Sequence, residues 1–159
     1  MRPALNWACM RTQGQLRIDP GSLEVGGSAE LEIVVPYSEW ALTQAVLRRA
    51  VALSAGLNVR IHLVAVHASP YPAPAGCPVL VHARLVQQLI DLAGACPVPV
   101  NSQVVLARYW DEGFRYAVKP HSTILIGTRR RFRRTQEEKL AQALAREGHE
   151  VALLHIDNN

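Results

Sequence analysis

The residues with the clearest chemistry in this sequence are five arginines within six positions, at Arg129, Arg130, Arg131, Arg133 and Arg134. A guanidinium group stays charged at any working pH and binds phosphate or carboxylate oxygens through two parallel hydrogen bonds. Such a cluster is typical of an anion site, and it is equally typical of a solvated loop in a basic protein. Both interpretations stay open here. For an anion site, the candidate ligands are a nucleotide, a cyclic dinucleotide, an acidic partner or an anionic membrane surface.

The place of this cluster in the chain is where a ligand-binding site is expected. The apolar run Thr123–Ile126 predicts a buried strand that ends in Gly127 and leads into a loop, and a helix is expected from Thr135 onward. In an open α/β sheet, ligands bind at loops that leave the carboxyl ends of central strands. The residues after the first predicted strand reach the same edge, so we add Pro36, Tyr37 and Ser38 to the candidate ligand-binding residues Gly127, Thr128 and the five arginines.

Other reactive residue types do not form a recognisable catalytic pattern. His62 and His67 are five positions apart on one predicted strand, so their side chains point to opposite faces. Cys9, Cys77 and Cys96 have no metal-ligand spacing, and we interpret them as free thiols. The pattern contains no paired carboxylates and no His/Asp/Ser arrangement. We therefore expect no enzyme, no metal and no cofactor beyond a weakly held nucleotide or anion.

Short apolar runs alternate with helical patterns from residue 31 to the end of the chain. This alternation predicts a parallel sheet with helices on both faces. Ser38 and Asp111 are expected to cap the first and third helices, and Thr135 with Glu138 fits a capping box. The expected strands are Leu31–Val35, Val59–Val66, Ser102–Ala107, Thr123–Ile126 and Val151–Ile156, and the expected helices are Glu39–Ser54, Leu80–Leu92, Glu112–Val118 and Thr135–Glu147.

Residues 1–30 have a different composition and are expected to form an extension outside the main domain, which spans residues 31–159. Within the extension, Asp19-Pro20-Gly21-Ser22 is a good turn between alternating segments and predicts a β-hairpin. Gly26-Gly27-Ser28 then predicts a flexible joint.

Charge and hydropathy limit the partners. The net charge is +4 and the arginine cluster contributes five positive charges, so the rest of the chain sums to −1. Because nucleic-acid binders usually spread basic residues over a whole face, this local basicity argues against nucleic acid. No apolar run approaches the roughly 18 residues that a membrane span needs, and no signal peptide is visible at Met1. We expect a cytoplasmic protein with no membrane span.

Several short matches in a fixed order resemble the universal stress protein family. They cover Leu31–Asp157, and their order and spacing are more specific than any one match. The resemblance implies a Rossmann-like α/β domain of the adenine-nucleotide alpha-hydrolase-like kind, with an open five-stranded parallel sheet of order 3-2-1-4-5. The matching segments are VVP at Val34–Pro36, LVAVH at Leu63–His67, QVVLA at Gln103–Ala107, ILIGT at Ile124–Thr128 and VALLHI at Val151–Ile156.

The resemblance also implies a nucleotide site, but this chain departs from it at most of the ligand positions. Family members that bind nucleotides have an aspartate two residues past the proline, where this chain has Ser38. Their glycine motif after the fourth strand keeps only Gly127 here, because Arg130, Leu140 and Ala141 stand at the other positions. Glycine lets backbone N–H groups approach phosphate oxygens, and these replacements remove that access. We therefore expect a regulatory or interaction module without an intact ATP-binding motif, and the alternative is a phosphate-ligand sensor that uses the arginine loop.

The last strand, Val151–Ile156, is a sheet edge in the implied order and contains no proline. An unprotected apolar edge can pair with another strand, and family members commonly dimerise through this one. We expect a homodimer here, whose candidate interface residues are Val151, Ala152, Leu153, Leu154, His155 and Ile156.

Overall fold

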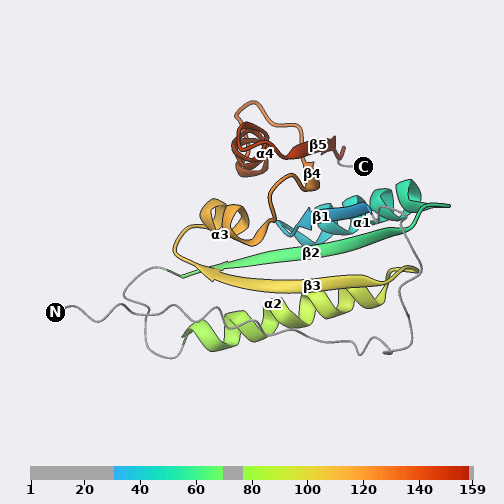
Figure 1. Ribbon diagram of the computed structural model, residues 1–159. Coiled ribbons are helices and arrows are strands. Elements are labelled where there is room, and N and C mark those ends of the chain that lie inside the picture. The colour runs from blue at the N-terminus through green and yellow to red at the C-terminus, as the bar shows by residue number, and fades with distance from the viewer. Residues whose placement is uncertain (1–30, 70–76, 158–159) are drawn as a thin grey trace.

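The computed structural model describes residues 31–69 and 77–157 of the chain (Figure 1). The strands are β1 (Leu31–Pro36), β2 (Val59–Ala68), β3 (Val100–Ala107), β4 (Thr123–Thr128) and β5 (Glu150–His155). The helices are α1 (Trp40–Ser54), α2 (Cys77–Gly94), α3 (Trp110–Ala117) and α4 (Gln136–Arg146). The predicted N-terminal hairpin lies outside the described residues.

The strands form one parallel sheet in the order β3-β2-β1-β4-β5, as expected. β1 pairs with β2 from Leu31↔Val59 to Pro36↔Val64, whereas the β1–β4 ladder has only the register positions Ile33↔Thr123 and Val34↔Ile124. β1 and β4 therefore do not pair with each other toward their carboxyl ends. This is also where the chain's connections switch from one side of β1 to the other, which is the usual ligand position in such sheets.

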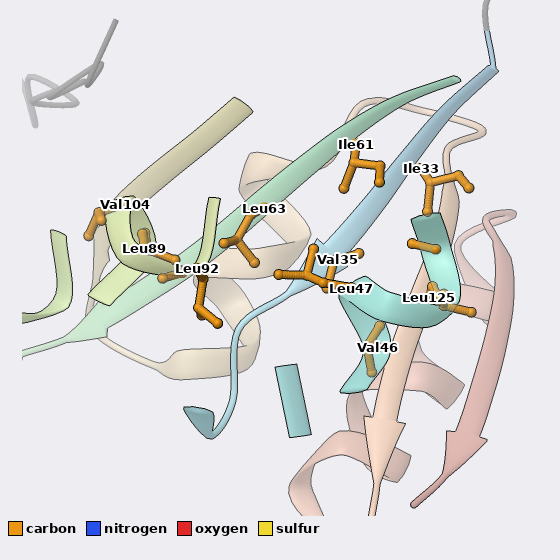
Figure 2. Close-up of a cluster of buried hydrophobic side chains, with 12 residues drawn as sticks. Ile33, Val35, Val46, Leu47, Ile61, Leu63, Leu89, Leu92, Val104 and Leu125 are labelled. Carbon is orange, nitrogen blue, oxygen red and sulfur yellow. The ribbon is translucent and has the colours of Figure 1, made fainter. Parts of the chain in front are cut away.

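Each face of the sheet is covered by a pair of helices and has its own apolar cluster, as the alternation of the sequence predicted. Val35, Leu63 and Leu125 point to the face covered by α1 and α2, where they meet Leu47 and Leu89 (Figure 2). The next residues along the strands point the other way, toward α3 and α4. In Figure 1, α2 lies below β3 and α3 lies above β2. The second cluster contains Val34, Val64, Val66, Val105, Ile124 and Ile126 from the sheet, with Phe114, Leu140 and Leu144 from the helices.

Two predicted helix caps are wrong. The N-cap of α1 is Glu39, whose side chain makes no capping hydrogen bond to the helix, and Ser38 instead donates its backbone N–H to Thr43 Oγ1 at 3.4 Å. Asp111 lies inside the first turn of α3, after the N-cap Tyr109. Its carboxylate therefore interacts favourably with the positive end of the helix dipole but does not cap the helix. Both helices begin close to the predicted residue but are shifted along the chain.

The capping box of α4 is confirmed. Thr135 Oγ1 accepts from the backbone N–H of Glu138 at 3.2 Å, and Glu138 Oε2 accepts from that of Thr135 at 3.4 Å. Gly56 and Gly148 end helices with φ values of +78° and +91°, which glycine adopts without strain. In the described part of the chain, no helix is long and apolar enough to cross a membrane.

Candidate functional site between β1 and β4

An open hollow of about 610 Å³ lies at the carboxyl edge of the sheet, between the residues that follow β1 and those that follow β4. The first side contributes Glu39 and Leu42, and the second contributes Arg129, residues 131–134 and the start of α4. The arginine cluster predicted from the sequence therefore reaches the switch point of the sheet. The volume of the hollow lies within the range of about 300–1,000 Å³ that small-ligand sites occupy.

An ion pair connects the two sides of this hollow. Arg129 Nη2 lies 2.7 Å from Glu39 Oε1, and the Arg129 side chain is 23% exposed. The Nε atom of Arg129 is buried and has no hydrogen-bond partner among the described residues. Arg129 is therefore held by the protein's own carboxylate. The local sequence does not predict this partner, although Glu39 stands directly after Ser38.

The start of α4 is occupied by the chain's own polar groups. Thr135 and Glu138 form the capping box, and Thr135 Oγ1 also lies 2.8 Å from Thr128 Oγ1. Glu137 adds a second carboxylate to the first turn. Because carboxylates near a helix N-terminus already offset the positive end of the helix dipole, this terminus attracts a further anion less than an uncapped one would.

Gly127 has a packing role in this structure. It is buried inside β4, and a Cβ atom built on it would lie 2.6 Å from Val46 Cγ2 of α1. The same Cβ would be 3.5 Å from the Leu42 carbonyl oxygen. Helix α1 thus crosses the backbone of β4 at close range, which requires glycine for reasons unrelated to a ligand.

The positions that correspond to the end of the family's phosphate motif lie in the interior of α4. Leu140 is 1% exposed and Ala141 is 8% exposed, and both pack in the second apolar cluster. This confirms the expectation that the motif's end has become ordinary helix. The backbone N–H groups of Leu140 and Ala141 are not available to a phosphate, because they form hydrogen bonds inside the helix.

The residues after β1 also differ from an open ligand pocket. Pro36 is buried at the end of the strand, and Tyr37 packs against the first apolar cluster. The Tyr37 hydroxyl donates to Gln88 Oε1 at 3.2 Å, and burial is the main cause that raises its pKa. Tyr37 therefore connects β1 to α2. Tyr37 and Ser38 are both half-buried, and neither lines the hollow, whereas the neighbouring Glu39 does.

The arginine loop itself is exposed. Arg134 Nη1 donates to Gln142 Oε1 at 3.0 Å, and Arg130, Arg131 and Arg133 have no ion pair within the described residues. Phe132, between them, is fully exposed, with a relative surface area of 112%. Phe132 is not among the candidate site residues predicted from the sequence, although it stands inside the RRRFRR pattern.

Two histidines approach each other near the carboxyl end of β2, His67 from that strand and His82 from α2. The rings of His67 and His82 have centroids 5.8 Å apart, and Nδ1 of His67 is buried without a hydrogen-bond partner among the described residues. Burial, with a smaller contribution from His82, lowers the pKa of His67. Among residues 31–69 and 77–157, no group of three or more His, Cys, Asp or Glu side chains could hold a metal ion.

No protein-family model and no curated protein matches the chain. Solved structures do match it. A universal stress protein family member from Burkholderia pseudomallei has a TM-score of 0.55 at 21% identity, covering 82% of this chain and 98% of its own. A universal stress protein from Archaeoglobus fulgidus has a TM-score of 0.55 at 13% identity, covering 77% of this chain and 92% of its own. The chain therefore has the fold of the universal stress proteins.

Proposed function

We propose that this chain is a non-catalytic regulatory or interaction module on the universal stress protein fold, located in the cytoplasm. In this proposal the hollow between β1 and β4 does not bind ATP, and the arginine loop is the surface that contacts an anionic partner. The observation that carries it is the state of the start of α4, where the capping box of Thr135 and Glu138 uses groups that a phosphate would need.

The side chains that line the hollow support a non-catalytic role. Arginine stays protonated at neutral pH, so it cannot act as a general base. The carboxylate of Glu39 is occupied by its ion pair with Arg129. Among the described residues, the lining contains no histidine or cysteine, the usual proton carrier and nucleophile near neutral pH.

The first prediction is that ATP at about 1 mM does not measurably stabilise the protein against thermal unfolding. A ligand with a dissociation constant of about 100 μM would add roughly 1.4 kcal/mol to the free energy of unfolding by mass action. Differential scanning fluorimetry with ATP, AMP and a cyclic dinucleotide measures this directly. A stabilisation of that size by ATP would show that the hollow is a working nucleotide site.

The second candidate function is a sensor for a phosphate-containing small molecule. It is favoured by the buried Nε–H of Arg129, because a buried donor without an acceptor is costly and an anion oxygen would satisfy it. A ligand-induced stabilisation that disappears in the Arg129→Gln variant would support this candidate. Retention of the effect in that variant would place the ligand elsewhere.

We also propose that β5 forms a homodimer with its own copy. The backbone N–H groups of Glu150 and Ile156 donate to Ser122 and Thr128, on the β4 side of the strand. Because hydrogen-bonding direction alternates along a strand, the N–H of Leu153 points to the open edge. An open edge of this kind can recruit a second strand across a two-fold axis.

The second prediction is that light scattering after size exclusion, at tens of micromolar protein, gives a dimer mass that Leu153→Pro reduces to a monomer mass. Proline removes the outward N–H without removing a hydrogen bond to β4. Leu153→Ala is the matched control, because it loses similar packing against the second apolar cluster but keeps the N–H, so it should remain a dimer. A monomer mass for the unmodified chain would contradict the proposal, and circular dichroism checks that both variants are folded.

A further inference from the structure

The most exposed large apolar side chain in the described part of the chain is Phe132, at the centre of the arginine loop. It has three arginines directly before it and two directly after it. A phenylalanine gains nothing from full exposure to water, and its transfer to an apolar environment is favourable. Its position is therefore informative about what the loop contacts.

The arginines around Phe132 divide into two groups. Arg129 is held by Glu39 and Arg134 by Gln142, so these two residues tie the ends of the loop to the domain. Arg130, Arg131 and Arg133 are exposed and have no ion pair with any described residue. The loop thus presents three uncompensated positive charges and one aromatic ring from an anchored base.

Further aromatic side chains lie at the same edge of the sheet. Trp40, at the start of α1 after β1, is 38% exposed, and Tyr109, after β3, is 55% exposed. Arg108 lies over the Tyr109 ring, with 5.3 Å between its Cζ atom and the ring centroid. Because all strands are parallel, the loops that follow β1, β3 and β4 leave the sheet at one edge. This edge combines exposed aromatic rings with arginines.

We propose that this edge docks onto a membrane surface that contains anionic phospholipids, with Phe132 inserted between headgroups and Arg130, Arg131 and Arg133 bound to lipid phosphates. The inference rests on the proposed function of the loop as an anionic contact surface. Basic residues next to a membrane and an inserted aromatic ring are two signals that strengthen each other. Aromatic side chains are also favoured at the headgroup level.

The shape and charge of the loop favour a lipid surface over other anionic macromolecules. Nucleic-acid binders spread basic residues along a groove or a stripe, whereas here the excess charge is confined to one loop and the rest of the chain sums to −1. An acidic peptide would need a groove that covers the aromatic ring, but Phe132 stays fully exposed although it lines the open hollow. A fully exposed ring suits a broad, deformable surface.

The test is co-sedimentation of the full chain with vesicles of phosphatidylcholine, with and without phosphatidylserine. We expect binding only to vesicles that contain phosphatidylserine, and weaker binding at high salt. Each basic residue near an anionic surface contributes about fivefold in partition, so Arg130→Gln with Arg131→Gln and Arg133→Gln should weaken binding about a hundredfold. Phe132→Ser should weaken it about tenfold, because the ring no longer leaves water.

Matched controls separate a local contact from general charge and hydrophobicity. Arg48→Gln with Arg49→Gln and Arg146→Gln removes the same charge from exposed positions on α1 and α4, and it should leave binding within about twofold of the unmodified chain. Tyr116→Ser removes an aromatic side chain that is 83% exposed on α3, and it should have no effect. Equal losses in the loop variants and in these controls would overturn the proposal, as would equal binding to phosphatidylcholine alone.

Two further probes distinguish failure of this inference from failure of the proposed function. An acidic peptide and a single-stranded oligonucleotide are tested against the same variants. Binding of either probe through the loop arginines, without binding to vesicles, would refute the lipid surface and keep the anionic contact surface. Absence of binding to vesicles, peptide and oligonucleotide would refute both.

Discussion

Phe114→Ala is expected to lower the free energy of unfolding by about 3–5 kcal/mol, the largest loss we predict for a single side chain. Phe114 is 0% exposed and belongs to the apolar cluster between α3, α4 and the sheet. Trp110 packs edge-on against its ring, with centroids 4.7 Å apart and an interplanar angle of 82°. Truncation removes this contact and leaves a cavity, because β2 limits how far α3 can move inward.

Guanidinium chloride unfolding measures this loss as a lower midpoint with an unchanged slope. Tyr116→Ala is the control in the same helix, since Tyr116 is 83% exposed and its truncation should cost less than about 0.5 kcal/mol. Similar losses for the two variants would mean that Phe114 is not the residue that fixes α3 to the sheet.

Gly127→Ala is expected to cost about 1–3 kcal/mol, because its Cβ would lie 2.6 Å from Val46 Cγ2. Val46 is 1% exposed and branched at Cβ, so its side chain has little freedom to move in α1. Substituting Val46→Ala in the same chain removes the atom in conflict. The double variant should therefore lose less stability than the sum of the two single variants.

This cycle distinguishes the packing role of Gly127 from a ligand role. If the glycine is needed for helix packing, the coupling between positions 127 and 46 is clear in unfolding measurements without any ligand. Gly94→Ala is the control, since a Cβ there meets nothing within 4 Å. A harmless Gly127→Ala substitution would contradict the close approach of α1 to β4.

The packing glycine also clarifies the relation of this chain to nucleotide-binding universal stress proteins. One glycine of the family motif is retained here, at Gly127, and the structure gives it a role that needs no phosphate. Retention of Gly127 is therefore not evidence for nucleotide binding. That the chain does not bind ATP is inferred instead from the capped start of α4 and from Leu140 and Ala141 inside that helix.

The sequence by itself determined the order of the elements and a parallel sheet with helices on both faces, and the strand order was what the resemblance to the universal stress protein family implied. Apolar runs such as Val34–Val35 and Ile124–Ile126 are buried on both faces of a parallel sheet, and their spacing from the helical patterns leaves few arrangements. It also located the arginine loop at the carboxyl edge. These features depend on local periodicity and on chain connectivity, which are visible in a linear sequence.

Only the tertiary structure decided what the candidate residues contact. The ion pair of Glu39 with Arg129 joins residues 90 positions apart, and the bond from Tyr37 to Gln88 joins residues 51 apart. The cap of α1 shifted to Glu39, because the chain after Pro36 turns to place Thr43 beneath the Ser38 N–H. Such contacts depend on the approach of α1 to β4 and of α2 to β1. Long-range packing sets these approaches, and a local pattern of residues does not encode them.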